Sequence, residues 1–580
     1  MLGRQAPPTV PVQPRPARGR EPVPDSGDLA LVDGTVLTLD PDVPDAEAVA
    51  IRGGRVAAVG STDEALEHVT GGTEVIDLDG RAALPGFIDT HLHVPMGGRR
   101  MAHVNCRSPP NESVADVQAR IAERAAETPD GEWIICSGYN LGLVWEAEGR
   151  HIDRWDIDEA APDNPVQINS VGGHTGSIYN SAALDLVDID RDTPDPEPPA
   201  VIERDEDGRP SGLVSEEAEL PLLDATPDET PEERRASVRR ALDQLLEWGV
   251  TTAHDALTTP GDLRIYQALD RQGKLPVRLG LMIQGDADED GSLGPEGEDV
   301  LEALATSGIE TGFGGDRLYV VGVKYFMDGA FTGRTAAMYD PYEGEPVPED
   351  SPRYDGLLHV SPEYFADRVE RAHEAGLRVC VHGQGDRGID HILDAFEAAV
   401  EPDEDHRFRI EHAGLTGPEQ LERIAGLGVC VSSSINFLGA DVSRNWVYWG
   451  EERMDWTYAL GSLFEYGIPT AANGDWPVAT GDPLLALRTA VTRETVTGEV
   501  VGPDQRIDVE DALRLYGPEA AYLEFAEDEK GTLAPGRLGD VTVLSDDPLE
   551  TPPSELTELD VEYTVVGGDV AYERGRGVRY

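Results

Sequence analysis

Short apolar runs alternate with amphipathic helical stretches through most of this chain, and this alternation limits the possible folds more than any other feature. Apolar strands that each lead into a helix are typical of parallel βα units. We count eight such runs, which predict an α/β fold, a (β/α)8 TIM barrel. The predicted strands lie at residues 83–90, 250–254, 277–283, 319–326, 377–382, 408–412, 429–433 and 469–474.

Other segments fall outside this regular pattern. Residues 94–249 are too long for an ordinary βα connection and predict an inserted subdomain after the first strand. Residues 28–82 and 528–580 carry short alternating runs with glycine turns, so we expect both chain ends to form one discontinuous small β-sandwich. Residues 1–27, rich in proline and arginine, predict a disordered tail, and residues 83–527 then form the barrel with its insertion.

The first predicted strand ends in two histidines, His91 and His93, within the sequence LPGFIDTHLH. Residues i and i+2 of a strand point to the same side, so both imidazoles can bind one metal ion. Barrel enzymes place their chemistry at the carboxyl ends of the strands, where these residues lie. We therefore expect His91 and His93 to be metal ligands, although a histidine pair of this spacing also arises by chance.

Lys324 lies inside an apolar strand, VVGVKYFMDG, that the barrel should bury. Burial of an unpaired ammonium is unfavourable, so this lysine must be paired, deprotonated or chemically modified. The chain has only three lysines and uses arginine almost everywhere else, although arginine is the better partner in a plain ion pair. We therefore expect a primary amine to be needed at this position. The alternative is a salt bridge to Asp328 or another acid.

Three more polar residues end predicted strands, namely His382 in LRVCVHGQGD, His412 in FRIEHAG and Asp475 in IPTAANGDWPV. Each has an ordinary explanation, either a hydrogen-bonded core histidine or a turn-forming aspartate. On strands of one barrel, however, they predict side chains that converge at its mouth. His254 and Asp255 end the second strand, and for these two we favour a packing or supporting role.

These motifs resemble the amidohydrolase superfamily, and more narrowly amidohydrolase family 3, whose members include N-substituted formamide deformylase-like enzymes. PGFIDTHLH, VKYFMDG, VHGQGD and IEHAG match its motifs in order, and the resemblance covers about residues 28–580. It implies that Lys324 is carboxylated and bridges two metal ions, and that His174 in SVGGHTGSIYNSAAL lies beside the substrate. It also implies a set of metal ligands consisting of His91, His93, Lys324, His382, His412 and Asp475.

With imidazole and carboxylate ligands, the expected cofactor is one or two divalent metal ions, zinc first, with manganese, iron or nickel also open. Metal-activated hydroxide would attack a non-peptide carbon–nitrogen bond, and Asp475 would act as general base and then as general acid. The expected substrate is a small amide or N-substituted formamide, although SSSINF on the seventh strand departs from the family pattern. A pocket for an apolar N-substituent, or simple packing, would explain the aromatic residues Tyr139, Trp145, Tyr179, Trp446, Trp449 and Trp476.

Two other kinds of enzyme and one binding protein remain alternatives. A mononuclear deaminase would use one metal ion with Lys324 unmodified. A cyclic-amide hydrolase would share the chemistry and differ in substrate. A catalytically inactive barrel scaffold would have no need for converging histidines and an aspartate, which argues against it. The deaminase would hold its ion with His91, His93, His382 and Asp475.

The chain carries 111 acidic and 47 basic residues, for a net charge of -64, and this excludes some partners. Such a charge repels phosphate backbones and anionic membranes, so we expect a small-molecule substrate and neither nucleic acid nor a membrane. Abundant acidic residues with few lysines resemble proteins of salt-loving organisms, so a haloarchaeal source is expected. Four scattered cysteines and the absence of a signal-like apolar segment predict a reduced, cytoplasmic protein, while homo-oligomerisation stays open.

Overall fold

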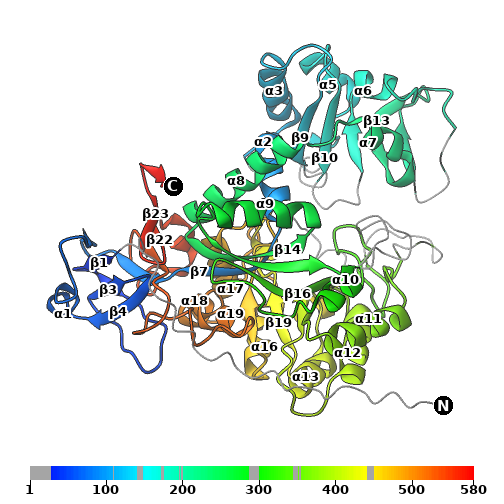
Figure 1. Cartoon of the computed structure of the whole chain (residues 1–580). Helices are drawn as coiled ribbons and strands as arrows, with labels where there is room; N and C mark the ends of the chain where they lie inside the picture. The colour runs from blue at the N-terminus through cyan, green and yellow to red at the C-terminus, as the bar shows by residue number, and fades with distance from the viewer. Residues whose placement is uncertain are drawn as a thin grey trace.

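The computed structural model describes residues 28–108, 110–139, 148–170, 176–194, 196, 200–285, 300–343, 351, 354–440 and 450–579. Its centre is a sheet of eight parallel strands (Figure 1), in the order β20-β19-β18-β17-β16-β15-β14-β7. This sheet confirms the predicted TIM barrel. Its strands are β7 (Phe87–Leu92), β14 (Val250–Thr258), β15 (Arg278–Gln284), β16 (Leu318–Phe326), β17 (Val379–Gly383), β18 (Arg409–His412), β19 (Cys430–Ser433) and β20 (Thr470–Ala472).

The first and last barrel strands differ from the sequence prediction. The predicted first strand is two strands, because the chain breaks at Gly86 and β6 (Ala82–Pro85) pairs outside the barrel with β21 (Val541–Leu544). A side chain at Gly86 would meet Thr251, since its Cβ would lie 2.2 Å from the Thr251 Cγ2. The last strand ends at Ala472, so Asp475 lies beyond the strand rather than at its end, with a φ of 43°.

Hydrogen bonds join β7 to the segment that follows β20. The Thr90 hydroxyl donates to the Ala472 carbonyl at 3.1 Å, and the Asp475 amide donates to the His91 carbonyl at 2.9 Å. One residue further, the His93 amide donates to the Trp476 carbonyl at 2.7 Å. These contacts hold the first and last strands of the barrel together at the carboxyl end.

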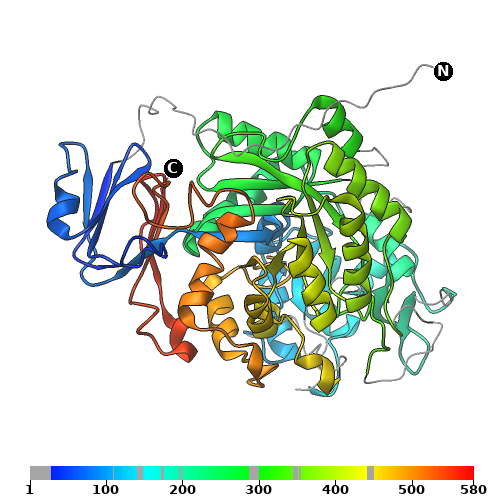
Figure 2. The ribbon, with the colours of Figure 1, turned by 90° about the horizontal axis from the view of Figure 1, so that it is seen from below.

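Helices cover the outside of the barrel (Figure 2). α8 (Pro231–Glu247) begins with a capping box, in which Thr230 and Glu233 bond each other's free backbone N–H groups. The chain then turns at Gly249, whose φ of 76° is a left-handed conformation that glycine adopts without strain. Around the other side, α11 (Pro362–Glu374) packs against α12 (Asp386–Ala399), and α12 against α13 (Pro418–Leu427).

Between β7 and β14 the chain forms a second sheet, which lies to one side of the barrel beyond α8 (Figure 1). This sheet contributes Ile168 to an apolar core. Two helices, α3 (Val114–Ala125) and α5 (Arg154–Ala160), contribute Val117 and Ile157 to the same core. A core of its own supports the predicted inserted subdomain. The sheet has the order β12-β13-β11-β10-β9-β8, with β8 (Val104–Asn105), β9 (Ile134–Tyr139), β10 (Val166–Ser170), β11 (Ser177–Tyr179), β12 (Val201–Arg204) and β13 (Pro210–Ser215).

The two ends of the described chain form two further sheets beside the barrel (Figure 2). Leu31 and Ile51 from the first segment share one apolar core with Val543 and Val565 from the last, which supports the proposed composite β-domain. One sheet has the order β4-β3-β1-β5, with β1 (Leu29–Val32), β3 (Ala48–Arg52), β4 (Arg55–Gly60) and β5 (Glu74–Asp77). The other has the order β2-β6-β21-β22-β23-β24, with β2 (Thr35–Val36), β22 (Val561–Val566), β23 (Asp569–Glu573) and β24 (Gly577–Val578).

Two further features of the structure concern the cysteines and the helices. All four cysteines are buried and free of disulfide bonds, so the fold depends on no cross-link between them. Within the described ranges, no helix combines the length and apolar character needed to cross a membrane.

Candidate metal centre

Four of the predicted ligands lie on four strands of the barrel, three of them neighbours in the sheet, and all four are near its carboxyl end. His91 is on β7, Lys324 on β16, His382 on β17 and His412 on β18, and all four are at or near the ends of their strands. Parallel strands of a barrel open at one mouth, so their last residues meet there. The rings of His382 and His412 have centroids 4.5 Å apart, and those of His412 and His91 are 4.8 Å apart.

His91, His93 and Asp475 form the tightest group of potential ligands. The Asp475 Oδ1 lies 3.5 Å from the His91 Nε2 and 3.1 Å from the His93 Nε2. Within the described parts of the chain, these three residues are the group whose ligand atoms all fall within 4.8 Å of one another. The His93 Nδ1 and the Asp475 Oδ1 are buried and have no hydrogen-bond partner in the part of the chain that the structure describes. Two nitrogens and a carboxylate oxygen suit a divalent ion such as zinc, so these residues fit a metal.

His382 and His412 are each held through one ring nitrogen. The His382 Nε2 lies 2.9 Å from the Gly329 carbonyl, and the His412 Nδ1 lies 2.7 Å from the Ser434 hydroxyl. Burial lowers the pKa of His382 to about 3, and burial together with the other histidines lowers the pKa of His412 well below its usual value. Both imidazoles are therefore neutral near pH 7, which is the form that binds metal ions. Each imidazole keeps its second ring nitrogen to coordinate a metal ion.

Lys324 is buried at the mouth, with 1% of its surface exposed, and among the described residues its Nζ has no hydrogen-bond partner. The Nζ lies 4.4 Å from the centre of the Phe326 ring. Burial lowers the pKa of Lys324 to about 8, although Glu411 and Asp475 act in the opposite direction, so roughly a tenth of the amine is neutral at pH 7. The alternative salt bridge to Asp328 is wrong, because within the described residues the Lys324 Nζ has no hydrogen-bond partner. The Asp328 carboxylate instead accepts hydrogen bonds from the backbone N–H groups of Ala337, Gln384 and Gly385.

The loop that carries Asp475 is fixed by residues from two other segments. The Asp89 carboxylate accepts hydrogen bonds from the backbone amides of His91 and Gly474, at 3.0 Å each. Two guanidinium groups donate to the Pro477 carbonyl, from Arg100 at 3.1 Å and from Arg107 at 2.8 Å. Sequence reasoning missed both arginines, which carry no motif and lie some 370 residues before the loop that they hold.

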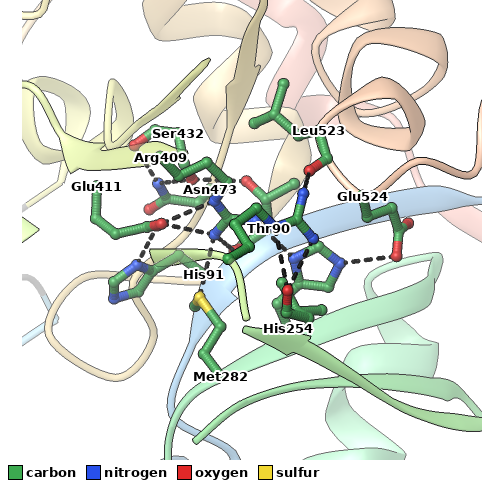
Figure 3. A network of polar contacts seen from close by, with 12 residues as sticks. Thr90, His91, His254, Met282, Arg409, Glu411, Ser432, Asn473, Leu523 and Glu524 are labelled. Atoms are coloured by element: carbon green, nitrogen blue, oxygen red, sulfur yellow. Dashed lines mark hydrogen bonds and ion pairs between the residues drawn. The ribbon is translucent and has the colours of Figure 1, made fainter. Parts of the chain in front are cut away.

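A network of buried polar contacts lies directly behind His91 (Figure 3). The His91 Nδ1 is 2.7 Å from the Glu411 Oε2, and the Arg409 Nε donates to the Glu411 Oε1 at 2.8 Å. His254 belongs to this network and not to the metal group, in line with the supporting role favoured from its sequence position. Asp255 has a different role, because its Oδ1 accepts a hydrogen bond from the Val94 amide at the start of α2 (Val94–Ala102).

The residues expected beside the substrate have a mixed outcome. His174 lies outside the described residues, and so do Trp145, Trp446 and Trp449. Tyr139 and Tyr179 are buried within the inserted subdomain, where their hydroxyls bond the Ile152 amide and Glu219. These two tyrosines pack the insertion and do not line a pocket at the mouth. Trp476 packs edge-on against Trp248, with ring centroids 5.3 Å apart.

An eight-stranded barrel that brings histidines, an aspartate and a buried lysine together at its mouth defines the class of metal-dependent hydrolases. More narrowly, the chain belongs to the Amidohydrolase family, whose model matches residues 74–572. It is accordingly a hydrolase of carbon–nitrogen bonds.

Individual relatives agree with this assignment. The chain is 30% identical to the N-substituted formamide deformylase of Arthrobacter pascens, over 94% of this chain and 98% of that one. It is 29% identical to the putative amidohydrolase YtcJ of Bacillus subtilis, over 93% and 98% of the two chains. Among solved structures, an uncharacterized metal-dependent hydrolase from Pyrococcus horikoshii matches with a TM-score of 0.71 and 27% identity, over 91% of this chain and 99% of that one.

Proposed function

We propose that this protein hydrolyses a small amide or N-substituted formamide at a centre of one or two divalent metal ions, with zinc as the first expectation. The observation that carries the proposal is the group of His91, His93 and Asp475, whose ligand atoms lie within 4.8 Å. The similarity to an N-substituted formamide deformylase along almost the full length of both chains supports the substrate class.

Lys324, His382 and His412 would complete a second metal position. The neutral Lys324 amine can attack carbon dioxide, which forms a nitrogen–carbon bond and releases one proton to leave a carbamate. The carbamate is an anion with two oxygens, so together with the histidines it would help to hold the metal ions. His91 and His93 would hold one ion, and His382 and His412 would hold the other. The buried Nζ supports this proposal, because the unmodified amine makes no hydrogen bond there within the described residues.

Asp475 would move the proton in the reaction. Bound metal supplies a Lewis acid that lowers the pKa of water towards 7 and polarises the carbonyl oxygen. The Asp475 carboxylate would accept the proton of the attacking water and then donate it to the departing nitrogen, which is a poor leaving group without that proton. The hydrogen bonds of Asp89, Arg100 and Arg107 to the surrounding loop keep the carboxylate in place for both transfers. His174 is proposed to contact the substrate.

Metal analysis combined with a substrate panel tests the proposal. Protein made in molar KCl should hold one or two metal ions per chain, and it should release formate from N-substituted formamides or acid from simple amides. Two ions per chain would favour the carbamate bridge. A single ion with release of ammonia from an amino-substituted ring would identify a mononuclear deaminase instead. Metal-free protein with no hydrolytic activity on the panel would leave the scaffold alternative.

The charge of the molecule carries a separate proposal, adaptation to high salt. With 111 acidic against 47 basic residues, repulsion opposes the folded state wherever salt does not screen it. Dilution from molar KCl to about 0.05 M should inactivate the protein, because the Debye length increases as salt falls. Full activity after prolonged dilution would contradict the proposal.

A further inference from the structure

The interior of the barrel holds a row of buried charged and polar side chains that begins behind His91 and leads away from the mouth (Figure 3). Glu411 contacts His91, Arg409 contacts Glu411, His254 contacts Arg409, and Glu524 contacts His254. Arg409 and His254 are each 0% exposed. Buried charges are unfavourable unless every one is paired, so this row requires an explanation beyond packing.

The Arg409 guanidinium has four different partners, one of which is the Met282 sulfur at 3.2 Å. Its Nε and one terminal nitrogen contact the Glu411 Oε1, each at 2.8 Å. The same terminal nitrogen donates to the Thr90 carbonyl at 2.8 Å, next to His91 in the chain. The other terminal nitrogen lies 3.1 Å from the His254 Nδ1. A guanidinium offers donors only, so the direction of every one of these bonds is determined.

These directions fix the protonation of both histidines. His254 must accept at Nδ1, because Arg409 donates there, so its proton is on Nε2 and points at the Glu524 Oε2, 3.2 Å away. Glu411 accepts from Arg409 on Oε1 and is left to accept from the His91 Nδ1 on Oε2. The His91 proton is therefore on Nδ1, and its Nε2 lone pair faces Asp475 and the candidate metal position.

We propose that Arg409 and His254 are positioning residues for the metal. Acting through Glu411, they hold His91 in the tautomer and ring orientation that binds the ion, and thereby set the affinity of the site. The inference rests on the proposed role of His91 as a ligand. A partner that orients a ligating histidine typically changes metal affinity by about 10–100-fold when it is removed. His254 would exert this effect from a strand that contributes no ligand.

The test compares two replacements of His254. His254→Phe keeps the ring shape but removes the acceptor for Arg409, and His254→Asn restores an acceptor where Nδ1 lies. We expect His254→Phe to weaken Co²⁺ and Zn²⁺ binding by about 10-fold or more, measured by chelator competition, and to alter the visible spectrum of the Co²⁺ protein. His254→Asn should recover most of the affinity and the wild-type spectrum. Arg409→Lys keeps the buried charge without the fork and should behave like His254→Phe.

A buried pair unconnected to His91 provides the control. Arg278 begins β15 beside β14, and its guanidinium contacts both oxygens of Asp540 at 2.7 and 2.8 Å. Arg278→Met should lower the stability of the fold, while metal affinity and the Co²⁺ spectrum stay at wild-type values.

Two results separate the failure of this inference from the failure of the proposed metal site. Wild-type affinity and spectrum in both His254→Phe and Arg409→Lys would overturn the inference, provided that His91→Ala loses metal. If His91→Ala itself keeps the metal, the proposed ligand set is wrong. An equal loss of affinity in Arg278→Met and His254→Phe would also overturn the inference, because it would show an effect of general destabilisation.

Discussion

Two lysines lie near opposite ends of the same barrel strand, and they are held in opposite ways. Lys530 is 5% exposed, and its Nζ lies 2.8 Å from the Glu524 Oε1 and 2.9 Å from the hydroxyl of Tyr319, near the start of β16. Lys324, near the end of β16, is 1% exposed and has no hydrogen-bond partner within the described ranges. Lys274, the third lysine, is exposed.

This difference suggests that Lys530 stabilises the fold, whereas Lys324 has a role in the reaction. A buried ammonium is tolerated where a carboxylate and further hydrogen bonds compensate for the lost water, as they do at Lys530. At the mouth Glu411 and Asp475 attract the Lys324 charge, but within the described residues no group makes a hydrogen bond to its Nζ. A fold that can pair a buried lysine at one end leaves another unpaired at the end where the candidate ligands gather. The following variants test whether this contrast marks the site.

The largest effect is expected from the histidines at the mouth. The double variant His91→Ala/His93→Ala should lose metal and activity together, because it removes two of the three closest ligand atoms, and the fold should persist. Metal per chain, turnover and circular dichroism measure the three outcomes. His406→Ala is the control, since His406 is buried but bonds the Leu427 carbonyl away from the mouth. Full activity in the double variant would remove the metal site from the mechanism.

A pair of aspartates extends the comparison to proton transfer. Asp475→Asn should retain most of the metal but lower kcat by about two to four orders of magnitude, the usual scale for a lost general acid–base. Asp540→Asn removes the carboxylate that contacts Arg278, far from the candidate ligands. It should lower the free energy of unfolding and leave kcat per folded molecule near the wild-type value. Steady-state rates and unfolding midpoints distinguish the two. A wild-type kcat in Asp475→Asn would exclude this residue as the proton carrier.

Lys324 tests the carbamate directly. Lys324→Ala should lose the second metal, and acetate or propionate should restore part of the activity by occupying the vacated bridge. Lys324→Arg should lose the second metal and the activity, although it keeps the positive charge, because a guanidinium forms no carbamate and repels metal ions. Metal content and rates with and without the added acid are measured for both. Lys530→Arg is the control and should keep its metal, since a guanidinium can still pair with Glu524. A Lys324→Arg protein with two metal ions and normal turnover would contradict the carbamate.

The strands of the barrel could be predicted from sequence because each is a short apolar run with glycines or charged residues at its ends. The predicted and observed bounds of β14 to β19 differ by at most four residues at either end. The prediction fails at the first strand, where Ala82–Pro85 is as apolar as the barrel strand that follows. Nothing in the local pattern shows that these residues pair with β21, more than 450 residues later in the chain.

Some residues of the site could likewise be predicted from the sequence, and others could not. His91 and His93 could be proposed because two histidines two residues apart on a strand must point to one side. The network of Arg409, Glu411 and His254 could not be predicted from sequence, because Arg409 and His254 are 155 residues apart and meet only inside the closed barrel. Their only sequence signal is charge within apolar runs, the same signal that identified Lys324.

The smallest expected effect is on the free energy of unfolding. It is measured by replacing each of the two buried lysines with methionine in metal-free protein. Lys530→Met leaves Glu524 buried without its cation and should lower the free energy of unfolding by about 3–5 kcal/mol. Lys324→Met removes an amine that has no partner, so stability should be unchanged or rise by about 1–3 kcal/mol. Chemical denaturation in molar KCl, with chelator present, measures both. A Lys324→Met protein destabilised as much as Lys530→Met would show that Lys324 is an ordinary structural cation.

The pH dependence sharpens this last test. Burial alone would raise the pKa of Glu524, but Lys530 and His254 more than offset it, so the folded-state pKa lies well below the ordinary value of 4.5. A carboxyl group with a depressed pKa stabilises the fold above its unfolded-state pKa, and this contribution is lost as the pH falls below that value. The stability gap between wild type and Lys530→Met should therefore be full above pH 4.5 and shrink in more acidic solution. Lys324→Met should show no such narrowing, because Lys324 does not contact Glu524. A constant gap for Lys530→Met down to pH 3 would mean that the pair is held by packing rather than by charge.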